Sequence, residues 1–154
     1  MYPRTMSGAE ELSDSVVSFV RGFGLHRPDR TPCGFEAGVA DAHALSELFA
    51  GPLRQLELVA RLGLAKSTVS RVVSNLVDRG WVMREPASDD GRGVRLALTA
   101  AGREAADRLR VARRRRMEAL LDQIPIDRRA EVIDVLELLH KAADASRPGH
   151  TDSW

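Results

Sequence analysis

Two short helices separated by a tight turn are predicted by the apolar positions between residues 56 and 80. The first runs from Leu56 to Leu62 and ends at Gly63, and the second begins near Lys66 and ends at Gly80. Glycine readily adopts the left-handed conformation that ends a helix. In the second helix, apolar residues recur three, four, seven and eight positions apart, which predicts one buried stripe: Val69, Val72, Val73, Leu76 and Val77.

The pattern changes period after Gly80. Residues 81–85 and 94–99 read as strands, and the loop between them contains Ser88, Asp89, Asp90 and Gly91. A helix-turn-helix followed by such a hairpin is a winged helix. The predicted fold class is therefore mainly α with a small antiparallel β wing, a winged helix-turn-helix. Leu53-Arg54 is expected to add a short strand beside the wing.

Further helices are expected on both sides of this segment. One begins after Ser7, where Ser7 and Glu10 resemble a capping box, and ends near Gly24. Others are expected over residues 35–50, over 100–123, and from an N-cap at Asp127 to about residue 145. The last is apolar around most of its circumference, so part of its surface is expected to meet a second chain.

The polar residues of the second helix lie off its apolar stripe. Short hydroxyls, an amide and basic groups suit close approach to base edges and phosphates in a major groove. The alternative is a plain solvated face on an amphipathic helix, but the Arg-bearing hairpin that follows favours DNA. The predicted contacts in this helix are Lys66, Ser67, Thr68, Ser70, Arg71, Ser74 and Asn75.

Charge is segregated along the chain, although the net charge of the 154 residues is only +1. Residues 53–116 carry 15 Lys and Arg against 7 Asp and Glu, whereas the remaining residues carry 8 against 15. A basic centre between acidic ends is typical of nucleic-acid binding. Arg supplies almost all of the positive charge, and it binds phosphate bidentately.

Other classes of protein are disfavoured by what the sequence lacks. No apolar run approaches the roughly 20 residues of a membrane span, and no signal-peptide core follows Met1, so a cytoplasmic location is expected. One cysteine, Cys33, allows no internal disulfide and too few thiols for a zinc finger. The four histidines show no metal-ligand spacing, and no catalytic motif is recognisable. We therefore expect no metal, no cofactor and no enzymatic activity.

Residues from about 38 to 104 resemble the MarR family of winged-helix transcriptional regulators. The resemblance is carried by residues 58–63, by 67–73, by 76–84, and by Asp90-Gly91-Arg92 followed by Leu98-Thr99-Ala100-Ala101-Gly102, the most specific of the four. It implies that Arg92 enters the minor groove and that Asp90 orients the hairpin through ion pairs. It also implies transcriptional regulation, usually repression, and release by a small phenolic or carboxylate ligand bound between the lobes.

The expected organisation is a homodimer. Residues 1–34 and 100–145 are predicted to form its helical dimerisation lobe, 35–99 the DNA-binding lobe, and 146–154 a tail. Two-fold symmetry would place the two recognition helices in successive major grooves, so the operator should be an inverted repeat. The Arg113–Arg116 run is expected mainly to be a solvated stretch paired with acidic neighbours, and in the alternative one or two of these residues line the ligand crevice.

Alternatives from other functional classes stay open at this point. One is a winged helix used for protein–protein assembly, with an acidic partner on the basic face. Another is a redox-sensing regulator that acts through Cys33, although Cys33 lies in the loop after the first helix rather than in it. An enzyme with this fold as an accessory is disfavoured, because the resemblance and its helical flanks occupy almost the whole chain.

Overall fold

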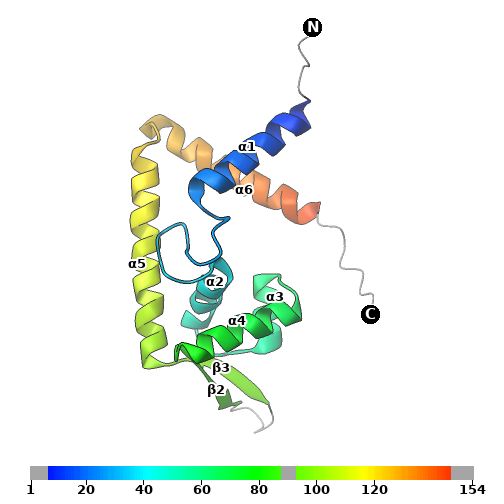
Figure 1. Cartoon of the computed structure of the whole chain (residues 1–154). Coiled ribbons are helices and arrows are strands. Elements are labelled where there is room, and N and C mark those ends of the chain that lie inside the picture. The colour runs from blue at the N-terminus through cyan, green and yellow to red at the C-terminus, as the bar shows by residue number, and fades with distance from the viewer. Residues whose placement is uncertain (1–6, 88–92, 147–154) are drawn as a thin grey trace. The chain divides into compact units, whose positions relative to one another are not determined.

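The computed structural model describes residues 7–87 and 93–146. The chain forms two compact units, residues 1–116 and 117–154, and the boundary falls within one helix. The elements, drawn in Figure 1, are α1 (Gly8–Phe23), α2 (Val39–Phe49), β1 (Leu53–Arg54), α3 (Gln55–Leu62), α4 (Lys66–Asp78), β2 (Val82–Pro86), β3 (Val94–Leu98), α5 (Ala100–Asp122), the 3-10 helix η1 (Ile126–Arg128) and α6 (Arg129–Ala145). This order confirms the mainly α fold class with a small antiparallel wing.

The ends of α1 are fixed by the residues that the sequence indicated. Ser7 is the N-cap, where its hydroxyl accepts the backbone N–H of Glu10 and the Glu10 carboxylate accepts the N–H of Ser7, so the capping box is confirmed. Gly24 ends the helix with φ +90°. Most apolar side chains of α1 are exposed, among them Leu12, Val16 and Phe19.

Helix α2 begins four residues later than predicted, at Val39 instead of Phe35. The preceding residues form a turn because the Thr31 hydroxyl accepts the backbone N–H of Phe35 at 3.0 Å, while the N–H of Thr31 is donated to the Phe35 carbonyl. The Phe35 ring packs against Trp81 with 5.8 Å between ring centroids. The aromatic residue therefore anchors a loop and does not extend a helical stripe.

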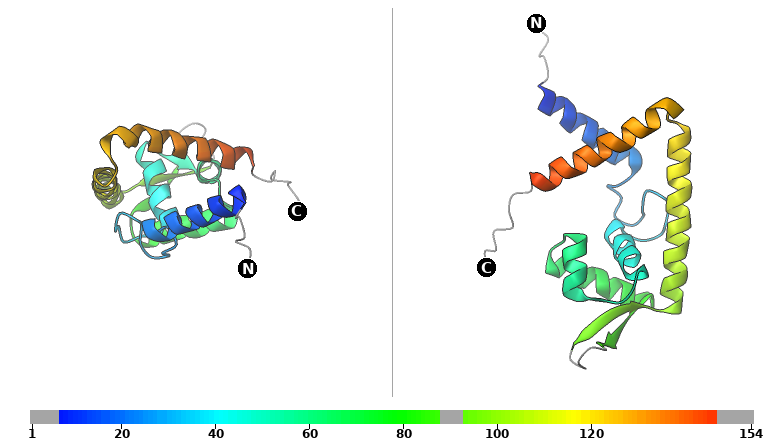
Figure 2. Two further views of the ribbon diagram at one scale, coloured as in Figure 1. Left: turned by 90° about the horizontal axis from the view of Figure 1, so that it is seen from above. Right: turned by 180° about the vertical axis from the view of Figure 1, so that it is seen from behind.

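The sheet has three antiparallel strands in the order β1-β3-β2, which confirms the short strand at Leu53-Arg54. Leu53 lies opposite Leu96, and the other strand of the hairpin pairs Val82 with Leu98. These four side chains are buried, so this face of the sheet closes the core. The hairpin projects from the helices of the first unit (Figure 2, right).

The core of the first unit is built by α2, α3, α4, β3 and the first half of α5. Full burial of a large apolar side chain contributes about 1.5–3 kcal/mol to the stability of the fold, because apolar surface is removed from water. The largest fully buried residues are Leu45, Leu48, Leu58, Val69, Val73, Leu76, Leu96 and Leu109. The predicted stripe of α4 is thus confirmed, with Val77 only partly buried.

The start of α5 is locked to the end of α4. The Thr99 hydroxyl donates to the Gly80 carbonyl at 2.6 Å and accepts the backbone N–H of Gly102 at 3.0 Å. The N–H of Thr99 is donated to the Trp81 carbonyl. A Cβ on Gly102 would lie 1.9 Å from that carbonyl oxygen, so only glycine permits this approach. The Leu-Thr-x-x-Gly motif therefore fixes where α5 leaves the wing.

The second unit contains the end of α5, η1 and α6. Asp127 does not cap the last helix, because Ile126–Arg128 form a 3-10 turn and α6 begins at Arg129. The turn is held by the Arg129 guanidinium, whose Nε donates to the Ile124 carbonyl at 3.1 Å. Every residue of α6 is described and none is buried; its exposed apolar side chains are Ile133, Val135, Leu136 and Leu138. No described helix is both long and apolar enough to cross a membrane.

Candidate nucleic-acid interface

Helix α4 separates an apolar face from a polar one. Val69, Val73 and Leu76 are fully buried against α2 and α3, and α3 lies beside α4 in the helix-turn-helix (Figure 1). Three residues stand opposite this stripe at helical spacing, Ser67, Arg71 and Ser74, and all are exposed. The exposed face therefore offers two hydroxyls around one guanidinium, which are groups that contact base edges and phosphates.

The other predicted contacts of α4 lie on the flanks of this face. Lys66 and Ser70 are exposed on one side, and Thr68 is half-buried on the other. Asn75 is exposed, but its side chain hydrogen bonds Asp41 at the start of α2. Part of the Asn75 amide is thus used within the protein.

Asp41 is a buried carboxyl that the sequence analysis did not single out. It is 8% exposed, and burial raises its pKa above the ordinary value, while the charge of Arg79 and the hydrogen bond from Asn75 act in the opposite direction. Asp41 therefore ties the C-terminal half of α4 to the first turn of α2. The sequence carried one signal for this role, an acidic residue in the first turn of a helix.

Arg79 makes a second tie from the end of α4 to the loop before α2. Its Nη1 donates to the Glu36 carbonyl at 2.8 Å, and its guanidinium lies over the Trp81 ring, 4.8 Å from the ring centroid. Sequence reasoning placed Arg79 only at the helix terminus, because the pattern of one helix does not show which distant carbonyl an arginine reaches. Asp41 and Arg79 therefore fix the C-terminal part of α4, the helix that carries the exposed polar face, to α2 and the loop before it.

The tip of the wing, which holds the predicted minor-groove residue Arg92 and the predicted orienting residue Asp90, lies outside the described residues. The strands that lead to it are described. Arg84 on β2 is exposed, whereas Arg95 on β3 is half-buried and lies opposite Glu85. The roles of Arg92 and Asp90 stay predictions.

An open hollow of about 390 Å³ lies beside the anchored loop in the first unit. Aromatic rings and guanidinium groups share its wall, which suits a planar anion. The lining residues are Cys33, Gly34, Phe35, Glu36, Arg79, Trp81, Arg108 and Ala112. The Cys33 thiol is partly buried at this hollow and lies 3.0 Å from the Thr31 hydroxyl.

The Arg113–Arg116 run is divided between several environments. Arg113 donates to the Ser46 hydroxyl at 3.3 Å, and Arg116 lies over the Phe23 ring, 5.6 Å from its centroid. Arg115 borders a shallow hollow on α5 with Asp107 and Arg108. These two contacts of Arg113 and Arg116 join α5 to α2 and α1 within the first unit, and neither of them involves an acidic group.

The pKa of His43 on α2 is affected by Arg113, the first arginine of this run. Burial lowers the pKa of its imidazole, and the positive charge of Arg113 lowers it further, while Glu47 acts in the opposite direction. In the described part of the chain, no group of three His, Cys, Asp or Glu side chains is placed to hold a metal ion.

Comparisons with known proteins show which regulators this chain is similar to. Residues 38–93 match the model of the MarR family. The chain is 29% identical over 117 residues to an uncharacterized HTH-type transcriptional regulator of Mycobacterium leprae. The matched segment covers 75% of this chain and 76% of that protein.

Solved structures of transcriptional regulators share the fold of this chain. A probable transcriptional regulator from Pseudomonas aeruginosa has a TM-score of 0.70 at 22% identity, over 85% of this chain and 98% of that one. The PcaV transcriptional regulator from Streptomyces coelicolor has a TM-score of 0.69 at 26% identity, over 90% and 99%. PcaV in complex with its natural ligand is similar as well, with a TM-score of 0.67 at 25% identity over 93% and 99%.

Proposed function

We propose that the chain is a cytoplasmic repressor of the MarR family that binds an inverted-repeat operator as a homodimer. The match of residues 38–93 to the model of that family and the likeness to PcaV support this proposal. One observation carries the DNA-binding part of this proposal. The α4 face made by Ser67, Arg71 and Ser74 stands opposite a fully buried stripe, so it is held rigidly and left open to a ligand. Rigid presentation of such a face is what major-groove readout requires.

The homodimer is supported by apolar surface on two helices. On α1, Leu12, Val16 and Phe19 are about half-exposed, and on α6 Leu136 and Leu138 are 50% and 66% exposed. Contiguous exposed apolar surface on a helix marks an interaction site, since water is excluded when it meets another apolar face. A second copy of this chain carries the same faces and can cover them by two-fold symmetry.

DNA binding by this dimer would combine two kinds of contact. Phosphate contacts from the basic first unit give affinity that falls steeply with salt. The α4 face reads base edges in the major groove, and Arg92 adds minor-groove contacts by family resemblance. Lys66, Ser70 and Thr68 lie at the edges of the α4 face, where phosphates flank a groove-bound helix.

Release of DNA is proposed to follow binding of a small anionic or phenolic effector. PcaV, which resembles this chain, has been solved with its natural ligand. Here the hollow at Phe35, Trp81, Arg79 and Arg108 offers rings and cations to such a molecule. Because Arg79 also holds the end of α4, a bound anion would compete for the guanidinium that positions the recognition helix.

Selection of bound duplexes from a random DNA pool at physiological salt tests the proposal. The expected result is an inverted repeat with half-sites about one helical turn apart. Recovery of no common sequence, with binding lost at moderate salt, would contradict it and would favour the winged helix as a protein-assembly module. A control selection with Arg71→Ala should lose the consensus if the α4 face reads the bases.

A further inference from the structure

Arg54 occupies the N-cap of α3, a position for which arginine is poorly suited. Ser, Thr, Asp and Asn are preferred there because their oxygens accept the free N–H groups of the first turn. A guanidinium has no acceptor atom, and its charge lies near the positive end of the helix dipole. The structure shows no side-chain cap at this residue. Arg54 therefore lowers the stability of α3 compared with a residue that caps the helix with its side chain.

The same side chain carries a second cost from the sheet. Arg54 on β1 is the register partner of Arg95 on β3, and Glu85 lies on the opposite side of Arg95, on β2. Like charges directly opposite each other in a sheet are destabilising. Within residues 7–87 and 93–146, no carboxylate pairs with the guanidinium of Arg54.

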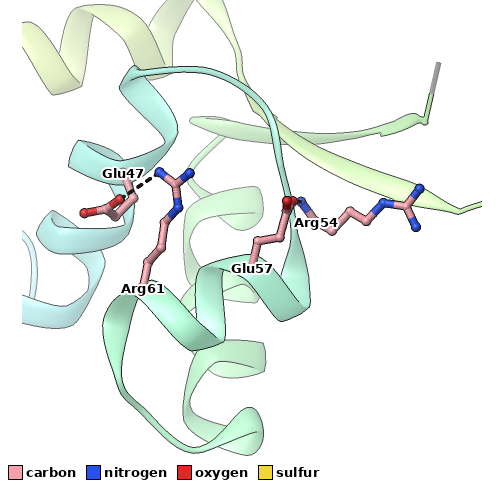
Figure 3. Close-up of polar contacts among 4 residues, drawn as sticks. All are labelled: Glu47, Arg54, Glu57 and Arg61. Atoms are coloured by element: carbon pink, nitrogen blue, oxygen red, sulfur yellow. Dashed lines mark hydrogen bonds and ion pairs between the residues drawn. The ribbon is translucent and has the colours of Figure 1, made fainter. Parts of the chain in front are cut away.

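The Glu57 carboxylate contacts the backbone of Arg54 instead of its guanidinium. Glu57 accepts the backbone N–H of Arg54 at 2.6 Å, so it caps the start of α3 in place of the side chain. Figure 3 shows the Arg54 side chain extending away from Glu57. Its Nη1 lies 3.6 Å from the position that a Cβ on Gly93 would take, at the base of the wing. The exposed guanidinium therefore stands between α3 and the wing.

We propose that Arg54 is a DNA-phosphate contact at the root of the wing, which adds affinity without sequence preference. This inference rests on the proposed DNA binding. A residue that breaks two local rules, and that has no carboxylate partner for its guanidinium among the described residues, is expected at a functional site. The first helix of a helix-turn-helix crosses the DNA backbone, and the wing enters the neighbouring groove, so a cation between them meets phosphate. Arginine binds phosphate through paired N–H donors.

Three variants test this contact: Arg54→Thr, Arg54→Lys, and the control Arg110→Thr, which removes an exposed arginine of α5 that is paired with its neighbour Asp107. Dissociation constants are measured against salt concentration, with the selected operator and with an unrelated duplex. Arg54→Thr should weaken both complexes about tenfold and, because each protomer of the dimer loses one phosphate contact, reduce the slope of log K against log salt by about 2. Arg54→Lys should keep that slope, and the control should change nothing.

Thermal unfolding of the same variants separates binding from folding. Threonine is a good N-cap, so Arg54→Thr should unfold at an equal or higher temperature while it binds DNA more weakly. An unchanged salt slope would overturn the proposal, and so would a loss of stability that accompanies the loss of binding. A loss confined to the operator would also overturn it, because it would mean a base contact.

Failure of the proposed function gives a different result. If the wild-type protein shows no sequence preference but Arg54→Thr still reduces the salt slope, the phosphate contact stands and the operator proposal fails. If the wild-type protein binds no DNA, both fail.

Discussion

Helices α4 and α6 differ in how they dispose of similar apolar side chains. In α4, Val69, Val73 and Leu76 are fully buried by neighbours from the same chain. In α6, whose residues are all described, Leu136 is 50% exposed and Leu138 is 66% exposed, and no residue is buried. Both helices carry apolar residues at helical spacing, so periodicity alone does not tell whether the covering surface lies in the same chain.

This difference distinguishes apolar side chains that are buried within one chain from apolar side chains that stay exposed. The winged helix has its own core, built from α2, α3, α4, β3 and α5. The apolar side chains on α1 and α6 are exposed, and the proposed homodimer would bury them. Perturbation of each region should therefore have distinct consequences, in folding for the first and in assembly for the second.

The largest effect is expected from Leu136→Asp on α6. If two copies of Leu136 are buried at a symmetric interface, their loss removes about 1.5–3 kcal/mol each, and dimer affinity falls roughly a thousandfold. Light scattering should show a monomer, and binding to an inverted repeat should weaken because the two half-sites are no longer linked. Lys141→Asp puts the same carboxylate on the polar side of α6 and should leave the dimer intact. A dimer that survives Leu136→Asp would place the interface elsewhere.

Gly102→Ala should lower the stability of the winged helix, because Gly102 is tightly packed against Trp81. The new Cβ would lie 1.9 Å from the Trp81 carbonyl oxygen, so α5 must shift away from the wing, at a cost of about 1–3 kcal/mol of unfolding free energy. Urea denaturation measures this cost. Gly22→Ala in α1 meets nothing within 4 Å and should instead stabilise by about 0.4–1 kcal/mol. Equal effects of the two substitutions would mean that the Thr99–Gly102 junction is not tightly packed.

DNA contacts should be separable from the core that supports them. Arg71→Ala should weaken operator binding by about 1–3 kcal/mol and relax the sequence preference, since Arg71 is exposed on the α4 face. Arg92→Ala should weaken binding as well. Neither variant should change the unfolding midpoint in circular dichroism. Unchanged affinity and salt slope for Arg92→Ala would remove the wing from the mechanism.

The smallest effect concerns the pH dependence of stability. The pKa of His43 is lowered in the folded state, so its unfolded form binds protons more tightly. The wild-type protein should therefore lose stability as pH falls from above the ordinary histidine value through the lowered folded pKa. His43→Gln should remove this part of the decline, as measured by urea unfolding between pH 5 and about 7.5.

Local patterns in the sequence were enough to predict the helices, the hairpin and the stripe of α4, because these depend on periodicity and on glycine at helix ends. Predictions were wrong where a distant contact competes with the local pattern. Phe35 lies outside α2 and packs on Trp81, and Asp127 lies in a 3-10 turn that Arg129 holds. Asn75 stays a predicted DNA contact, and its side chain also bonds Asp41, which the helical pattern alone does not show.

The junction at Thr99 joins the first turn of α5 to the end of the recognition helix. The Thr99 hydroxyl bonds both the Gly80 carbonyl and the backbone N–H of Gly102. The part of α5 that belongs to the first unit, residues 100–116, is about 25 Å long at ~1.5 Å per residue. A tilt of about 5° at the junction corresponds to about 2 Å at residue 116. A displacement of that size at residue 116 would therefore reach α4 as a small change of angle.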